Sequence, residues 1–319
     1  MHPYAALTPE VVLDAVAALG SRPDGRLLAL SSYENRVYQV WLDDDPPVVV
    51  KFYRPGRWSE AQIDEEHAFA YELASHEIPV VAPTAKSVFG GFTLALYPRR
   101  GGRTPEFDNP KVLEWIGRFM GRIHAVGSAR SFAHRPTLDA QTFGREPREW
   151  LLKSGFVPAD LLDAWKAVTE QALQMVDACY ARAGELRAIR LHGDCHAGNV
   201  LWTEDGPHFV DLDDARMGPA IQDLWMLLSG DRAAMSRQMH DVLSGYEQFM
   251  EFDRRQLNIL EALRTLRLLH YSAWIGRRWD DPAFPAAFPW FNTQRYWQDR
   301  ILELREQIAL MQEEPLTVD

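Results

Sequence analysis

Hydrophobic and polar positions follow two different periods along the chain. Up to residue 97 the apolar segments are short and separated by turn residues, which is typical of strands. These segments are residues 27–30, 36–41, 48–53, 80–81, 87–89 and 92–97. Beyond residue 105 apolar residues recur every three or four positions over long stretches, which predicts helices. The pattern therefore predicts an α+β fold in which a β-rich part precedes a larger, mainly α-helical part.

Helix signals are also present within the β-rich part. Thr8 as N-cap, Pro9 at the first helical position and Gly20 past the apolar run predict a short first helix. Ser59 and Gln62 have the spacing of a capping box, and a second apolar run of helical period begins there. We expect this second helix to accompany a five-stranded antiparallel sheet.

The composition limits the cellular compartment and the binding partners that we expect for the protein. The net charge of −11 disfavours non-specific binding to nucleic acid or to anionic membranes. The sequence has no run of about 18 apolar residues, and its start lacks the features of a signal peptide. The two cysteines, Cys179 and Cys195, are too few for a disulfide framework and fit a reducing compartment. We expect a cytoplasmic monomer without a nucleic-acid or membrane partner.

The densest chemical signal is His-Gly-Asp-Cys-His-Ala-Gly-Asn at residues 192–199, followed by Phe-Val-Asp-Leu-Asp at residues 209–213. Asp194 carries a carboxylate that can accept a proton from an attacking hydroxyl. Asn199 and Asp211 offer the oxygen ligands that Mg²⁺ prefers beside the phosphates of a nucleotide. The spacing predicts phosphoryl transfer, with Asp194 as catalytic base and with Asn199 and Asp211 as ligands of Mg²⁺.

Two other kinds of chemistry are disfavoured in the same loop. His192, Cys195 and His196 are residue types that bind zinc, but a zinc site needs a fourth ligand and a rigid cage. Gly193 and Gly198 indicate an irregular loop instead. A nucleophilic Cys195 would need a lowered thiol pKa, for which the sequence offers no signal.

The order of the motifs resembles a known fold. The chain resembles the protein-kinase-like fold, in the aminoglycoside and choline kinase branch that has a His-Gly-Asp loop. It is most similar to the bacterial stress response kinase A proteins in four stretches, SSYENRVYQV, VVVKFYRPGRWS, LHGDCHAGNVLW and FVDLDDARMGPAIQDLWMLL. The resemblance implies a small antiparallel β lobe with one helix that binds nucleotide (residues 1–97), a hinge (98–105) and a large α-helical catalytic and substrate lobe (106–319).

The resemblance implies a lysine–glutamate pair in the small lobe. Lys51 ends a β-branched run and would hold the α- and β-phosphates of ATP. Glu66, on the same helix face as Phe69, would pair with Lys51, and Glu65 is the alternative partner.

Two further contacts with the nucleotide follow from the resemblance. Residues 31–36 take the place of the glycine-rich loop of protein kinases but contain no glycine. Backbone amides there would cradle phosphate, and the Ser32 hydroxyl would add a donor. Leu96, Tyr97 and Pro98 would contact the adenine, chiefly through backbone groups.

Four acidic residues follow the catalytic loop. Asp211 takes the place of the metal-binding aspartate of protein kinases, although this chain reads Asp-Leu-Asp-Asp there. Asp213 either reaches the same metal or is solvated, and these alternatives stay open. Asp214 is expected to be structural. The resemblance implies that Asp223 is buried and accepts backbone N–H groups of the catalytic loop, and an unpaired buried carboxylate would be too costly.

The acceptor of the phosphoryl group is the least determined property. The resemblance implies a serine/threonine protein kinase of the bacterial stress response. Only eleven residues separate Asp211 from Asp223, which leaves no room for a long peptide-docking segment and by itself favours a small alcohol such as choline, homoserine or an aminoglycoside. A catalytically dead nucleotide-binding scaffold is disfavoured because all three catalytic positions are filled.

Overall fold

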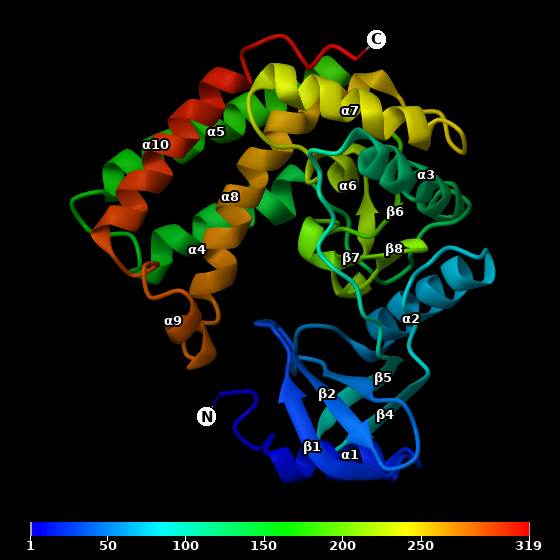
Figure 1. Cartoon of the computed structure of the whole chain (residues 1–319). Helices are drawn as coiled ribbons and strands as arrows, with labels where there is room; N and C mark the ends of the chain where they lie inside the picture. Colours follow the sequence, from blue (N-terminus) through cyan, green and yellow to red (C-terminus); the bar gives the residue numbers. More distant parts are fainter. Residues whose placement is uncertain (1, 319) are drawn as a thin grey trace. The chain divides into compact units, whose positions relative to one another are not determined.

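The computed structural model describes residues 2–318, which form two compact units (Figure 1). Unit 1 comprises the described residues up to Pro105 together with Ala197–Asp214. Unit 2 comprises Glu106–His196 and the described residues from Ala215 onward.

Unit 1 contains the five-stranded antiparallel sheet that the sequence predicts. Its strands are β1 (Pro23–Ala29), β2 (Arg36–Leu42), β3 (Val48–Phe52), β4 (Ala85–Phe89) and β5 (Phe92–Pro98), in the order β1-β2-β3-β5-β4. The prediction of a strand at residues 80–81 is wrong, since Val80 makes only an isolated bridge to Phe209. Pro79 and Pro83 flank this segment, and proline cannot donate to a strand ladder.

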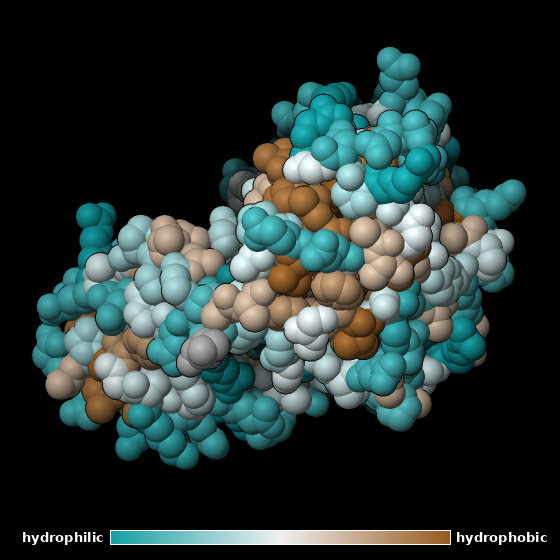
Figure 2. Space-filling view, turned by 90° about the horizontal axis from the view of Figure 1, so that it is seen from below, coloured by the Kyte–Doolittle hydropathy of each residue, from teal (hydrophilic) through white to brown (hydrophobic). Residues whose placement is uncertain are grey.

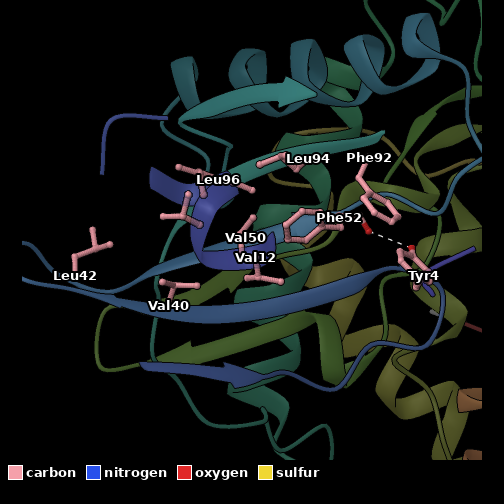
Figure 3. Packing of buried hydrophobic residues seen from close by; sticks show 11 residues of the cluster. Tyr4, Val12, Val40, Leu42, Val50, Phe52, Phe92, Leu94 and Leu96 are labelled. Carbon is pink, nitrogen blue, oxygen red and sulfur yellow. Dashed lines mark hydrogen bonds between the residues drawn. The ribbon is translucent and has the colours of Figure 1, made fainter. Parts of the chain in front are cut away.

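The two faces of the sheet have different partners because side chains alternate along each strand. On one face Val50 and Phe52 of β3 share a buried cluster with Val12 of helix α1 (Pro9–Ala18), as Figure 3 shows. Tyr4 joins this cluster and donates a hydrogen bond to the carbonyl of Phe52. On the other face Tyr53 packs with Ile63 of helix α2 (Glu60–Ser75). Unit 1 therefore has a helix for each face, where the resemblance implies one helix.

Both helices of unit 1 begin as their capping signals predict. The Thr8 side chain accepts the amide of Val11 at the start of α1. Ser59 and Gln62 form the reciprocal capping box of α2. The predicted N-termini are confirmed.

A hairpin from later in the chain belongs to unit 1. Strands β7 (Val200–Thr203) and β8 (Gly206–Phe209) pair with each other. The amide of Arg103 donates to the carbonyl of Trp202 at 2.9 Å, and the Val81 amide donates to the Phe209 carbonyl at 2.9 Å. The sequence groups these residues with the helical part, but their backbone hydrogen bonds join them to unit 1.

Unit 2 is mainly helical, as predicted. Its helices are α3 (Pro110–Gly127), α4 (Glu146–Ser154), α5 (Leu162–Ala183), α6 (Ile221–Trp225), α7 (Arg232–Tyr246), α8 (Leu260–Gly276), α9 (Ala283–Ala287) and α10 (Gln294–Leu310). Two short strands, β6 (Ile189–Leu191) and β9 (Arg216–Gly218), pair antiparallel. Helix α3 packs closely against α7 at Gly117, which has no side chain. A Cβ added there would come within 2.0 Å of the carbonyl oxygen of Val242. This close packing brings α3 side chains to the segment that follows β9.

Within residues 2–318, large hydrophobic side chains that are exposed include Trp115, Phe249, Trp290 and Leu302. On the face shown in Figure 2 hydrophobic residues are interspersed with hydrophilic ones. Within residues 2–318, no helix combines the length and the apolar character that crossing a bilayer requires.

Candidate active site

Lys51 and Glu66 form a buried ion pair in unit 1. Strand β3 directs Lys51 to the sheet face that α2 covers, opposite to Val50. The Lys51 Nζ donates to Glu66 Oε1 at 3.0 Å, and the two side chains are 6% and 3% exposed. The structure therefore brings together the lysine and the glutamate that the sequence pairs, and Glu66 rather than the alternative Glu65 occupies this position.

Two further carboxylates approach the same ammonium group. Asp211 Oδ1 and Asp213 Oδ1 each lie 3.2 Å from Lys51 Nζ. Burial by itself would lower the pKa of Lys51, but Asp213 and Glu66 outweigh it and hold the pKa well above its usual value. Lys51 is therefore a permanently charged cation at physiological pH.

A polar network lies behind the ion pair. The Tyr53 hydroxyl is 3.1 Å from Glu66 Oε1, 2.8 Å from His67 Nε2 and 3.2 Å from the Tyr97 hydroxyl. Burial first, and then the carboxylate of Glu66, raise the pKa of Tyr53 against the opposing effect of Lys51, so the phenol stays protonated and can donate. These contacts restrict the rotamer of Glu66 and so fix the position of Lys51.

Asp211 has an unusual backbone conformation. Its φ is +61°, in the left-handed region that non-glycine residues seldom adopt. Its side chain is 48% exposed, far more than that of Asp213 at 4%. The Asn199 carbonyl accepts the amide of Val210 at 3.0 Å, which holds Asn199 beside the residue that precedes Asp211. The two predicted metal ligands are therefore neighbours within unit 1.

Asp213 and Asp214 are both bound by Arg57. Arg57 pairs with Asp213 through Nη1, and its Nη2 lies 2.8 Å from Asp214 Oδ1. The same guanidinium is 3.9 Å from Glu34 Oε2. Of the alternatives left open for Asp213, solvation is wrong, because Lys51 and Arg57 enclose its carboxylate.

The loop that carries Ser32 is held at its C-terminal end. Arg54 Nε donates to the carbonyl of Glu34 at 3.0 Å, and the Arg54 amide donates to Asn35 Oδ1 at 3.0 Å. Tyr4 donates to the same Glu34 carbonyl. Ser32 itself is half-buried between β1 and β2. A loop without glycine is thus ordered by side-chain contacts, and the contact of Ser32 with phosphate stays a prediction.

The predicted hinge residues are the last three of β5. Leu96 pairs with Val50 of β3, and its carbonyl accepts the amide of Thr84 at 2.7 Å. Tyr97 directs its hydroxyl to Tyr53, and Pro98 ends the strand. Contact of these residues with adenine stays a prediction.

Asp194 lies in unit 2, in the loop that follows β6. Its side chain is 25% exposed. Arg267 Nη1, from helix α8, donates to Asp194 Oδ1 at 2.8 Å, and His196 Nε2 lies 3.4 Å from Oδ2. Both oxygens therefore have a nitrogen neighbour, and these two contacts restrict the orientation of the carboxylate.

Asp223 holds this loop through hydrogen bonds with its backbone. Its two oxygens accept the amides of His192 and Gly193, each at 2.8 Å. His124 of α3 lies 3.1 Å from Asp223 Oδ2, and the Asp223 side chain is fully buried. Gly193 has a φ of +88°, which a residue with a Cβ seldom adopts. The prediction that Asp223 is a buried acceptor of loop amides is confirmed.

Cys195 is a packing residue. It is fully buried with its Sγ 3.7 Å from Met120 Sδ. Burial, followed by Asp223 and Asp194, raises the pKa of its thiol well above the usual value, opposite to what a nucleophile needs. Within residues 2–318, no group of three or more His, Cys, Asp or Glu side chains is arranged to hold a metal ion by itself.

Arg57 and Arg267 are site residues that sequence reasoning did not identify. Arg57 lies in the VVVKFYRPGRWS stretch, but its partner Asp213 is 156 positions away. Arg267 is 73 positions from Asp194 and lies on an ordinary amphipathic helix. No local pattern distinguishes either arginine from a surface arginine.

Comparisons with known proteins agree on one family. The sequence profile of the phosphotransferase enzyme family (APH) matches residues 26–260. Stress response kinase A of Escherichia coli strain K12 is 45% identical over 318 residues, which are 98% of this chain and 96% of that protein. Serine/threonine protein kinase RdoA of Salmonella typhimurium is 45% identical over 321 residues, with the same shares covered.

Solved structures with low identity share the fold. Amicoumacin kinase hAmiN, in complex with AMP-PNP, Ca²⁺ and Ami, has a TM-score of 0.73 at 19% identity, with 97% of this chain and 95% of that chain covered. Choline kinase from Cryptosporidium parvum has a TM-score of 0.65 at 11% identity, with 95% and 96% covered. These similarities confirm the kinase-like α+β fold.

Proposed function

Because the chain belongs to the phosphotransferase enzyme family and to its stress response kinase A group, we propose that it is a serine/threonine protein kinase that uses ATP and Mg²⁺. It is an ATP-dependent kinase by family. The choice of a protein acceptor rests on the similarity to serine/threonine protein kinase RdoA of Salmonella typhimurium, which covers nearly the whole chain.

The observation that carries phosphoryl transfer is the position of Lys51. A buried, charged ammonium lies 3.0 Å from Glu66 and 3.2 Å from the half-exposed Asp211. Such a cation can bind nucleotide phosphates, because Glu66 fixes it while Asp211 remains open toward solvent.

The donor set near Asp211 suits Mg²⁺. Asp211 offers a carboxylate and Asn199 an amide oxygen, and Mg²⁺ prefers such hard oxygen ligands. Two protein ligands are sufficient, since Mg²⁺ at phosphoryl-transfer sites takes its other ligands from water and the phosphates. When bound, the metal would neutralise charge on the phosphates.

Asp194 is proposed as the catalytic base. Its carboxylate orients the acceptor hydroxyl and takes its proton as the hydroxyl oxygen bonds to the γ-phosphorus. The bond from that phosphorus to the bridging β–γ oxygen breaks, and ADP leaves. Asp223 orients the loop that carries Asp194 and does not touch the reacting atoms.

The protein acceptor can be tested with γ-labelled ATP and Mg²⁺. We expect label on the protein itself or on casein, and no label on choline, homoserine or kanamycin. Label confined to one of these alcohols would replace the protein-kinase proposal with a small-molecule kinase. Nucleotide binding without any transfer would indicate a scaffold.

The metal ligand has a separate test. Asp211→Asn should abolish the Mg²⁺ dependence of nucleotide binding measured by calorimetry, because it removes the half-exposed carboxylate beside Lys51. Asp214→Asn is the matched control, since Asp214 pairs with Arg57 and is not proposed to bind the metal. An unchanged Mg²⁺ titration in Asp211→Asn would contradict the assignment.

A further inference from the structure

Arg267 is the charged partner of the proposed base. It comes from α8, which begins 66 residues after Asp194, and its Nη1 lies 2.8 Å from Asp194 Oδ1. The ion pair is partly open, with side chains 42% and 25% exposed. An exposed pair of this kind contributes little to folding stability. Its geometric effect is larger, because it restricts the rotamer of Asp194.

The same arginine lines a pocket of about 580 Å³ in unit 2. The other lining residues are Trp225, Arg264, Leu268, Tyr271, Glu303, Glu306 and Gln307. Arg267 therefore belongs both to the wall of this pocket and to the environment of Asp194. A group that enters the pocket meets the guanidinium that holds the proposed base.

Arg264 provides an internal comparison. It lies one turn before Arg267 on α8 and lines the same pocket. Its Nη1 pairs with Glu261 at 3.2 Å, and its guanidinium lies over the ring of Trp225. The two arginines thus share a helix and a pocket but differ in whether they bind Asp194.

We propose that Arg267 is a positioning residue that holds the Asp194 carboxylate in the orientation from which it accepts the acceptor proton. This inference rests on the proposed function, because it concerns the base of that reaction. Arginine suits the role, since its planar guanidinium fixes direction as well as charge. His196 also lies near Asp194 but is more distant, at 3.4 Å from Oδ2.

The test compares Arg267→Ala with Arg264→Ala in transfer from γ-labelled ATP to the acceptor that the unaltered protein labels. Arg267→Ala should lower kcat about 10- to 100-fold, because a misplacement of about 1 Å at a reacting group has effects of that size. The KM for ATP should stay within about twofold, since ground-state nucleotide binding is untouched. Arg264→Ala should leave kcat near that of the unaltered protein.

Two rescue measurements separate positioning from a structural role. Arg267→Lys keeps the charge without the planar geometry and should recover only part of kcat. Guanidinium ion added at millimolar concentration should raise the kcat of Arg267→Ala, because the pocket admits it, and should not raise that of Arg264→Ala. A merely structural arginine would respond to neither measurement.

Several results would overturn the inference. They are equal kcat values for the two alanine variants, a higher kcat in Arg267→Ala, or a loss that guanidinium and lysine leave unchanged. Absence of any transfer by the unaltered protein would instead overturn the proposed function, and the inference with it.

Discussion

The charged side chains of the candidate site differ in burial between the two units. In unit 1 Lys51, Glu66 and Asp213 are each at most 6% exposed, and both carboxylates contact the Lys51 ammonium. In unit 2 Asp194 is 25% exposed and its partner Arg267 is 42% exposed. Loss of one partner of a buried ion pair strongly destabilises the folded protein, whereas an exposed ion pair contributes only about 0–1 kcal/mol to its stability. We therefore expect stability and activity to be linked in unit 1 and separable in unit 2.

The largest effect is expected for Asp194→Asn. The substitution keeps the size of the side chain but removes the proton acceptor, so kcat should fall by about 10³-fold. Nucleotide binding measured by calorimetry should remain, because unit 1 carries the residues proposed to bind ATP. The Tm should change by no more than a few degrees, about the effect of 1 kcal/mol. Retention of most activity would contradict the assignment.

Lys51→Met tests the expectation that stability and activity are linked in unit 1. It leaves Glu66 and Asp213 without their shared ammonium, so the free energy of unfolding should fall by about 3–5 kcal/mol along with activity. Urea titration measures the first effect and initial rates the second. Lys86→Met is the control, because Lys86 pairs with the exposed Glu60 and should cost about 1 kcal/mol or less. Equal losses in the two variants would remove the distinction.

The effect of Asp223→Asn should lie between those of the two preceding substitutions, because Asp223 is buried but belongs to unit 2. The change replaces one acceptor oxygen with an NH₂ group, which then faces the amide of either His192 or Gly193. Stability should fall by about 1–3 kcal/mol, the usual effect of an unsatisfied buried polar group. Because the loop also shifts, kcat should fall while the KM for ATP stays the same. A raised KM with normal kcat would point to a different role.

The smallest effect concerns pH. The folded protein raises the pKa of Lys51 above its ordinary value of 10.5, chiefly through Asp213 and Glu66 acting against burial. A raised folded-state pKa means that this contribution to stability is fully present below the unfolded pKa and is lost as pH rises through the folded pKa. The stability difference between the unaltered protein and Lys51→Met should therefore stay constant from about pH 8 to 10 and narrow only above that range. Denaturant midpoints measured across this range test it, and a narrowing below pH 9 would contradict the prediction.

Local patterns were sufficient for much of the fold and half of the site. Capping signals located the starts of α1 and α2. The Lys51–Glu66 contact was expected from the resemblance to kinases, in which a strand lysine pairs with a glutamate of the next helix. The capping signals depend on residues that are close in the sequence, so they can be recognised in a single chain.

Long-range pairing escaped prediction for a common reason. Asp213 meets Arg57 and Asp194 meets Arg267 across separations of 156 and 73 residues, and either arginine is compatible with an exposed surface position. The strand assigned to residues 80–81 failed for a related reason, since its one ladder partner, Phe209, comes from a distant hairpin. Burial and partner choice at such positions depend on which distant segments pack together.

The sequence by itself determined the candidate chemistry: residue types and spacing predict a loop with a base and two oxygen ligands, and the resemblance implies a lysine–glutamate pair. Only the tertiary structure decided which charges are neutralised and which stay open. It enclosed Asp213 between Lys51 and Arg57, left Asp211 half-exposed in a left-handed conformation, and placed Arg267 on Asp194. The physical reason is that desolvation and ion pairing act over a few ångströms in space, whatever the separation along the chain.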